Sequence, residues 1–381
     1  MKLIKRILAV MLVLCMTLGL AGCGDTTWIC EVDGNTVAAG LYIYYQNEGY
    51  GDALYNLVQE DSNTYFMHYL YYYNYGYVDP ELFSVTLSNG ETVEEHINNY
   101  ALDMCKQVVI MDKLFDELGL EFTADEQALI DTQVRSAWSN AQESWESAGV
   151  SEASFKAALV ANYKEDKVFD AYYEVGGRNG TTEEEIKDYF ADNYARIKYV
   201  TFTFADSVDD AIDEARKNEQ LDLANEYLAS AQSGTPMDEL IKQYNEYLAS
   251  LETEEEDDDV VNVDLSGNDD DADNEYANES VLSKESTYPT EKFVNYVFTT
   301  VKVGDYSVIQ DDTCFYLVER LDVRERTDLY DQYRNSIMQE LFDGDFTRLI
   351  NQELAKYTVN VNNNSVKRYT VKQTFADAYN N

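Results

Sequence analysis

The residue pattern changes abruptly at YARIKYVTFTF, residues 194–204. From Ile97 up to that point, apolar residues recur at spacings of three and four, which is typical of amphipathic helices. Residues 197–204 instead alternate in polarity and are rich in β-branched and aromatic side chains, which predicts a strand. Residues 288–322 predict a helix, a turn at Gly304 and two further short strands. The chain must therefore contain a small β-containing module within a mainly helical fold.

The helices before the module have well-defined start and stop signals. Thr123 with Glu126 and Thr182 with Glu185 have the spacing of capping boxes, and Gly119 and Gly149 are placed to end helices. The apolar spacing becomes helical again over residues 327–354, and a strand-like YTVNVN follows. We expect the helices on the two sides of the module to belong to one domain.

These patterns predict an α+β chain of mainly helical character. The expected organisation is a helical domain over residues 23–195, a β-containing module over 196–324 and a C-terminal part over 325–381 that completes the helical domain. Within the module, residues 252–280 form an acidic insertion, which we expect to be solvated. Closely spaced carboxylates suit hard cations, but the tract lacks the spacing of an EF-hand loop.

The N-terminus has the order of a bacterial lipoprotein signal. Lys2, Lys5 and Arg6 precede an apolar stretch that ends in LAGC, residues 20–23, which resembles a lipobox. The resemblance implies that residues 1–22 are a signal peptide and that Cys23 is lipidated. We therefore expect the protein on the extracytoplasmic face of the bacterial cell membrane, held by a lipid anchor.

The remaining side chains argue against several kinds of site. Cys30, Cys105 and Cys314 are widely spaced and are expected to be buried thiols, although one disulfide is possible. His68 and His96 have no ligand-spaced partners, so we expect no metal site. No phosphate-binding loop or nucleophile elbow occurs, so no cofactor is expected.

The net charge of −44 bears on the choice of partner. Such a surface repels nucleic acid and anionic lipid headgroups, so neither is expected as a partner. It favours basic polypeptides or loosely held cations instead.

Several motifs occur in the order found in PrsA/SurA-type extracytoplasmic foldases. They are EVDGNTVAAGLYIYY (31–45), LGLEFTADEQ (118–127), TTEEEIKDYFADN (181–193), RIKYVTF (196–202), SGTPMDELIKQY (233–244) and the stretch 293–322. The chain resembles that family over nearly the whole length after the signal. The resemblance implies a SurA/PrsA-like helical chaperone domain with an inserted parvulin-like prolyl isomerase domain.

The chain differs from the family at the positions of the family's catalytic residues. Tyr199 and Tyr316 stand at the positions of the two parvulin histidines, and Asp264-Leu265-Ser266-Gly267 is at most a remnant of the family's glycine-rich loop. A tyrosine hydroxyl can donate a hydrogen bond but has no charge that can be tuned near neutral pH. We therefore expect isomerase activity to be weak or lost, and the sequence leaves open whether the chain is an enzyme.

The tyrosine-rich run between Tyr42 and Tyr77 is the candidate surface for binding polypeptides. Tyrosine offers a large amphipathic contact area at a low entropic cost. The candidate residues are Tyr65, Tyr69, Tyr72, Tyr73 and Tyr75. The same run could instead form an aromatic core of the helical domain or a loop, and both alternatives stay open.

The sequence thus predicts an anchored chaperone or foldase that binds unfolded or nascent secreted polypeptides. The alternatives are an active parvulin-type prolyl isomerase and a non-catalytic surface or solute-binding lipoprotein. The long helical stretch argues against a solute-binding protein, whose two lobes alternate strands and helices. The sequence makes no prediction of oligomeric state.

Overall fold

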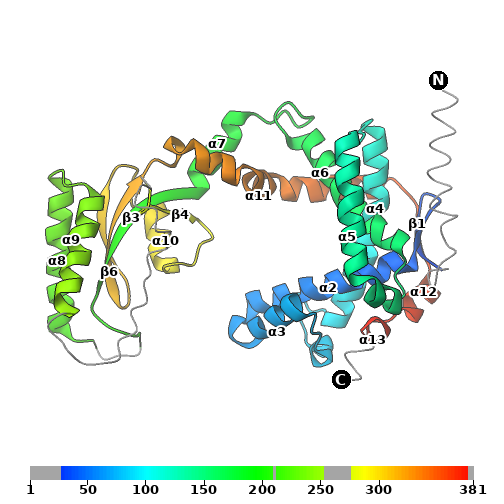
Figure 1. Ribbon diagram of the computed structural model, residues 1–381, viewed down its shortest axis with the longest axis horizontal. Helices are drawn as coiled ribbons and strands as arrows, with labels where there is room; N and C mark the ends of the chain where they lie inside the picture. Colours follow the sequence, from blue (N-terminus) through cyan, green and yellow to red (C-terminus); the bar gives the residue numbers. More distant parts are fainter. Residues whose placement is uncertain (1–26, 209–211, 253–275, 376–381) are drawn as a thin grey trace. The chain divides into compact units, whose positions relative to one another are not determined.

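The computed structural model describes residues 27–208, 212–252 and 276–375 (Figure 1). They fold as two compact units. Unit 1 comprises the described residues of Met1–Gly180 and Phe342–Asn381, and unit 2 comprises those of Thr181–Leu341. Unit 2 thus includes the module expected over 196–324, together with neighbouring residues on both sides. The expected signal segment 1–22, Cys23, the loop remnant at residues 264–267 and residues 253–275 of the acidic insertion lie outside the described residues.

Unit 1 contains most of the helices that the periodicity predicted. Its elements are β1 (Trp28–Val32), β2 (Asn35–Ala38), α2 (Ala39–Glu60), α3 (Ser62–Tyr75), η1 (Pro80–Ser84), α4 (Val93–Glu117), α5 (Ala124–Ala148), α6 (Glu152–Tyr173), β7 (Val359–Val361), α12 (Asn363–Arg368) and α13 (Val371–Thr374).

Unit 2 contains the larger sheet. Its elements are α7 (Glu183–Asn193), β3 (Tyr194–Thr203), α8 (Glu214–Gln232), α9 (Met237–Glu252), β4 (Ser280–Ser283), α10 (Glu291–Thr299), β5 (Tyr306–Gln310), β6 (Cys314–Leu321) and η2 (Val323–Glu325). The long helix α11 (Thr327–Leu354) runs from unit 2 into unit 1, with the change of unit between Leu341 and Phe342.

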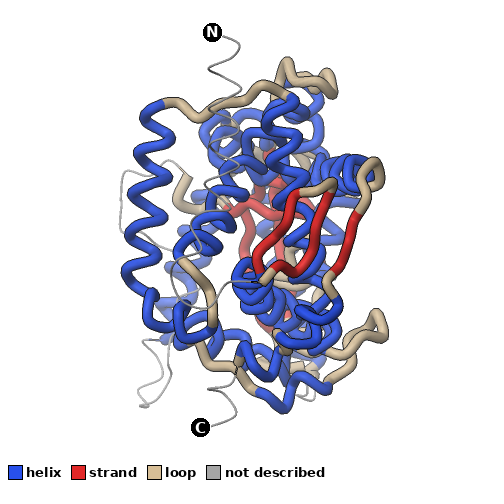
Figure 2. Tube along the Cα trace, turned by 90° about the vertical axis from the view of Figure 1, so that its right-hand side faces the viewer, coloured by secondary structure: helices blue, strands red, loops and turns tan. Residues whose placement is uncertain are grey.

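The predicted α+β class is confirmed. Helices make up most of the described chain, and the strands form two small antiparallel sheets (Figure 2). No helix of the described residues is both long and apolar enough to serve as a membrane span.

The small sheet of unit 1 joins the two ends of the chain. Strand β1 pairs with β2 on one side and with β7 on the other, so that Cys30 faces Val361. Asp33 and Gly34 both have positive φ and connect β1 to β2, as a two-residue hairpin turn requires. The core beside it packs Tyr50, Leu54 and Leu57 of α2 against α4 and α13.

The sheet of unit 2 has the strand order β4-β3-β6-β5, and all neighbouring pairs are antiparallel. The predicted strand at 197–204 is observed as β3, one of the two central strands. Because side chains alternate across a strand, β3 contributes to two cores. Phe202 packs under α8 and α9, and Ile197 packs on the α10 side, with helices on both faces (Figure 1).

Helix ends agree with the local sequence signals. Thr123 and Glu126 form the reciprocal bonds of a capping box, whereas Thr182 caps α7 by accepting only the Glu185 amide. Gly119 and Gly149 have positive φ at the ends of α4 and α5, which a residue with a Cβ rarely adopts. Cys30, Cys105 and Cys314 are buried thiols, as expected, and these three described cysteines form no disulfide with one another.

Candidate functional site

The two tyrosines at the expected histidine positions lie together on one face of the unit 2 sheet. Tyr199 of β3 pairs with Val318 of β6, and Tyr316 lies two residues before Val318, on the same face. The two ring centroids are 5.9 Å apart. Phe293 of α10 covers both rings, with centroids 5.5 Å from Tyr199 and 4.6 Å from Tyr316. The structure thus places Tyr199 and Tyr316 in one aromatic cluster.

Several polar groups lie next to this cluster. Tyr288 lies close to Tyr199, and the Cys314 thiol lies close to Tyr316. Thr290, at the start of α10, donates to the carboxylate of Asp311, which is buried. Sequence reasoning missed Tyr288, Phe293 and Asp311, because they come from separate loops and a helix with no shared motif.

Burial determines the charge state of the cluster. Desolvation is the main cause that raises the pKa of Tyr199, of Tyr316 and of the Cys314 thiol. All three groups therefore stay protonated near neutral pH. They can donate and accept hydrogen bonds, but they cannot serve as a base or as a thiolate nucleophile. The chain's two histidines, His68 and His96, both lie in unit 1.

The tyrosine-rich run of unit 1 divides between core and surface. Tyr42, Tyr45 and Tyr50 of α2 are buried, as the core alternative expected. Helix α3 has no buried residue at all, and no Asp, Glu, Lys or Arg occurs between Ser62 and Val78. The α3 surface consists of its exposed large side chains and the one that follows the helix: Phe66, Met67, Tyr71, Tyr73, Tyr75 and Tyr77.

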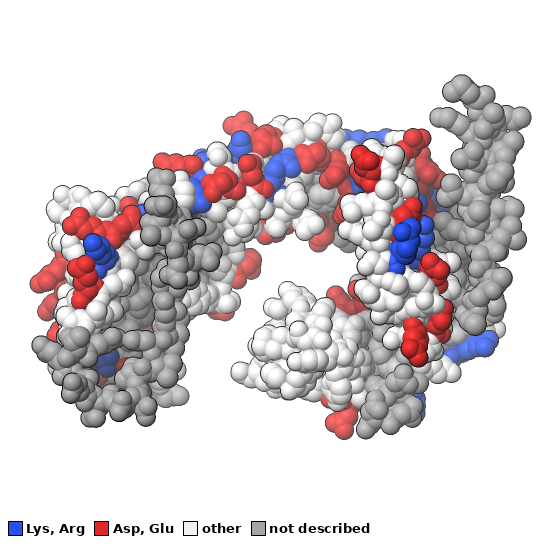
Figure 3. All heavy atoms as spheres, viewed as in Figure 1, with Lys and Arg blue, Asp and Glu red and all other residues white. Residues whose placement is uncertain are grey.

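The five candidate tyrosines of α3 therefore have different surroundings. Tyr65, Tyr69 and Tyr72 are partly buried and pack against the core of α2 and α4. Tyr73 and Tyr75 are exposed, Tyr75 to 79%. Figure 3 shows the visible face of α3 without acidic or basic atoms, although the chain carries 72 acidic and 28 basic residues. An uncharged aromatic face on so acidic a protein is a candidate interaction surface.

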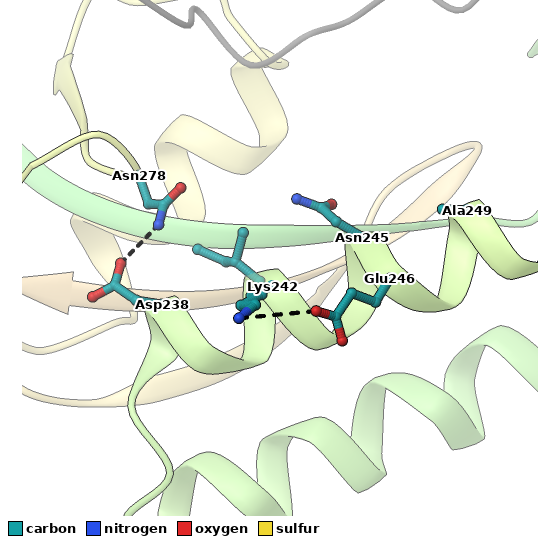
Figure 4. A pocket seen from close by; sticks show the side chains of 7 residues that line it. Asp238, Lys242, Asn245, Glu246, Ala249 and Asn278 are labelled. Atoms are coloured by element: carbon teal, nitrogen blue, oxygen red, sulfur yellow. Dashed lines mark hydrogen bonds and ion pairs between the residues drawn. The ribbon is translucent and has the colours of Figure 1, made fainter. Parts of the chain in front are cut away.

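Two hollows in unit 2 are weaker candidates for a binding site. One, of about 370 Å³, lies along α9, where Asp238 accepts from Asn278 and Lys242 pairs with Glu246 (Figure 4). The other, of about 680 Å³, lies between α7, η2 and α11. There Arg324 pairs with Asp188 at 2.7 Å, and Tyr330 donates to Glu183. The polar groups of both hollows are largely paired with one another.

No group of three or more potential metal ligands occurs among the described residues. His96 lies between two carboxylates, with Nε2 2.6 Å from Asp52 Oδ2 and Nδ1 3.6 Å from Glu91 Oε2. The hydrogen bond to Asp52 raises the pKa of His96. This arrangement is an ion pair between α2 and the start of α4.

Comparison with known proteins finds matches among solved structures. No protein-family model matches the chain, and no curated protein matches it. The chain is similar in structure to PrsA foldases.

Three PrsA structures illustrate the degree of similarity. The foldase protein PrsA from Lactococcus lactis is 15% identical over 91% of this chain and 100% of its own, with a TM-score of 0.33. PrsA from Streptococcus pneumoniae is 16% identical over 76% of this chain and 99% of its own, with a TM-score of 0.31. PrsA from Bacillus subtilis is 14% identical over 80% of this chain and 100% of its own, with a TM-score of 0.22.

Proposed function

We propose that this protein is a membrane-anchored extracytoplasmic chaperone or foldase that binds unfolded secreted polypeptides. The α3 surface is the observation that carries the proposal. It presents aromatic side chains without charge, which suits contact with many apolar sequences. The anchor would be the lipid at Cys23, and it would raise the local concentration of the chaperone where clients emerge.

The proposal is tested by the ability of the protein to prevent aggregation of an unfolded secreted protein. The variant Tyr71→Ser/Tyr73→Ser/Tyr75→Ser removes three exposed rings and leaves the core of unit 1 intact. We expect client affinity to fall about tenfold or more, which corresponds to about 1.4 kcal/mol. The matched control is Tyr247→Ser/Leu248→Ser/Leu251→Ser, which removes three exposed apolar side chains from α9 and should keep full protection. Full protection by the α3 variant would contradict the proposal.

We further propose that prolyl isomerase activity is weak or lost. Prolyl isomerisation has a barrier of about 18–20 kcal/mol, which a foldase lowers with preorganised hydrogen bonds in a dry pocket. The aromatic cluster of Tyr199, Phe293 and Tyr316 offers such bonds only from neutral hydroxyl groups. An active isomerase is the second candidate, because Tyr199 and Tyr316, which stand at the positions of the two parvulin histidines, lie together on one face of the sheet.

A proline-limited refolding assay distinguishes the two candidates. We expect the protein to accelerate refolding little, and Tyr199→Phe to leave the rate unchanged. A clear acceleration that Tyr199→Phe abolishes would establish the isomerase instead.

A further inference from the structure

Tyrosine side chains of other helices pack against two glycines in the middle of α2, Gly49 and Gly51. A Cβ on Gly49 would lie 3.1 Å from Tyr100 Cδ1 of α4. A Cβ on Gly51 would lie 3.0 Å from both Tyr72 Cε1 and Tyr73 Oη of α3. Glycine therefore lets these rings lie directly against the backbone of α2. As a result, the helical turn of α2 that follows Glu48 is in contact with aromatic rings of both α4 and α3.

Two carboxylates without a cationic partner belong to this region. Glu48 is exposed and lies close to the Tyr44 hydroxyl. Glu165 of α6 is partly buried. Among the described residues, neither lies within ion-pair distance of a Lys, Arg or His side chain. The neighbouring Asp52 differs, because it is paired with His96 at 2.6 Å.

Tyr100 connects these two carboxylates. Burial, followed by the negative charges of Glu48, Asp52 and Glu165, raises the pKa of Tyr100 to about 12. Desolvation also raises the pKa of Glu48 and of Glu165, and no positive charge is close enough to offset this shift. The ring of Tyr100 therefore lies within electrostatic range of both free carboxylates.

A buried hydroxyl without a partner lies in the same region. The hydroxyl of Tyr45 makes no hydrogen bond, although the side chain is only 3% exposed. Burial is the main cause that raises the pKa of this hydroxyl, and nearby Cys105, Tyr44, Tyr100 and Glu165 raise it further. A buried hydroxyl without a hydrogen-bond partner lowers the stability of the folded protein. A ligand that supplies the missing partner therefore binds with a gain in free energy.

We propose that Glu48, Glu165 and the rings of Tyr44, Tyr73 and Tyr100 take up a lysine or arginine side chain of a bound polypeptide. An ammonium or guanidinium group can contact aromatic faces and carboxylates together. A divalent metal would need more oxygen ligands than these residues supply. This inference rests on the proposed function and specifies it. Tyr73 also belongs to the α3 surface, so preferred clients carry a basic residue next to aromatic or apolar ones.

The test compares two labelled, unstructured peptides rich in tyrosine and leucine, one with two lysines and one with glutamines in their place. Fluorescence anisotropy measures their binding to the full chain. We expect the lysine peptide to bind about tenfold more tightly, as partly desolvated cation–π and ion contacts allow. In Glu48→Gln/Glu165→Gln, this preference should fall to within about twofold, with glutamine-peptide binding unchanged.

A matched control removes the same amount of charge elsewhere. Glu121→Gln/Glu143→Gln changes two exposed carboxylates outside the region and should keep the lysine preference. If the preference persists in Glu48→Gln/Glu165→Gln, or falls equally in both double variants, it comes from net charge and the inference is wrong. If the wild type binds both peptides equally, the inference alone fails. If it binds neither peptide, the proposed function fails as well.

Discussion

At the scale of single residues, Glu279 is the buried charge on which the edge of the unit 2 sheet depends. Its side chain is 4% exposed and accepts bonds from Arg196 of β3 at 2.6 and 2.7 Å and from Arg326 at 2.9 Å. Glu279→Gln would leave two largely buried guanidinium groups without their shared counter-charge. We expect the free energy of unfolding of unit 2 to fall by about 3–5 kcal/mol. Hydrogen exchange of the β3 amides measures this directly.

Glu325 provides the control, because it contacts the same Arg196 at 3.1 Å but is 69% exposed. A solvated pair of this kind contributes only about 0–1 kcal/mol, so Glu325→Gln should change β3 exchange little. Equal effects of the two substitutions would show that burial of Glu279 is unimportant.

The burial of Glu279 could not be predicted from the sequence. It lies at the end of the expected acidic insertion 252–280, where local composition predicts a solvated carboxylate. Its partners are 83 and 47 residues away in the chain. The same limitation applies to the aromatic cluster, where the register that joins Tyr199 to Tyr316 comes from pairing of β3 with β6.

At the scale of elements, two helical glycines have opposite surroundings and should respond oppositely to alanine. Gly344 of α11 has open space where a Cβ would lie, so Gly344→Ala should stabilise unit 1 by about 0.5–1 kcal/mol. A Cβ on Gly51 would instead approach Tyr72 and Tyr73 at 3.0 Å. Gly51→Ala should therefore displace α3, with a net loss of about 1–3 kcal/mol typical of overpacking.

Urea unfolding measures the change in stability for both variants, and hydrogen exchange of α3 measures its displacement. Faster exchange confined to α3 is expected in Gly51→Ala only. Stabilisation by both substitutions would mean that the rings of Tyr72 and Tyr73 move aside freely.

Elements with strong local signals were predictable, and those defined by long-range contacts were not. The cap at Thr123 and the strand at 197–204 are confirmed, because capping and period-two alternation are local properties. Strand β4 was missed, since its four residues Ser280–Ser283 carry no alternation of their own. Most tyrosines of the run are buried in α2, whereas no residue of α3 is buried. Composition alone could not distinguish the two cases, because tyrosine occurs both in cores and on surfaces.

At the scale of the whole molecule, the two units can be monitored by separate probes. All three tryptophans, Trp28, Trp138 and Trp145, lie in unit 1. Tryptophan fluorescence therefore reports on unit 1, and exchange of the β3 amides reports on unit 2. Helix α11 is the one element shared by both units among the described residues.

Substitutions in the two cores should therefore affect only their own unit. Phe155 is buried, with ring centroids 5.4 Å from Trp138 and 5.8 Å from both Trp145 and Tyr44. We expect Phe155→Ala to lower the stability of unit 1 by about 3–5 kcal/mol, with β3 exchange unchanged. Phe293→Ala should speed β3 exchange and leave the fluorescence midpoint unchanged, since its contacts lie within unit 2. A shift of both probes by either variant would mean that α11 transmits unfolding from one unit to the other, because a continuous helix propagates cooperatively.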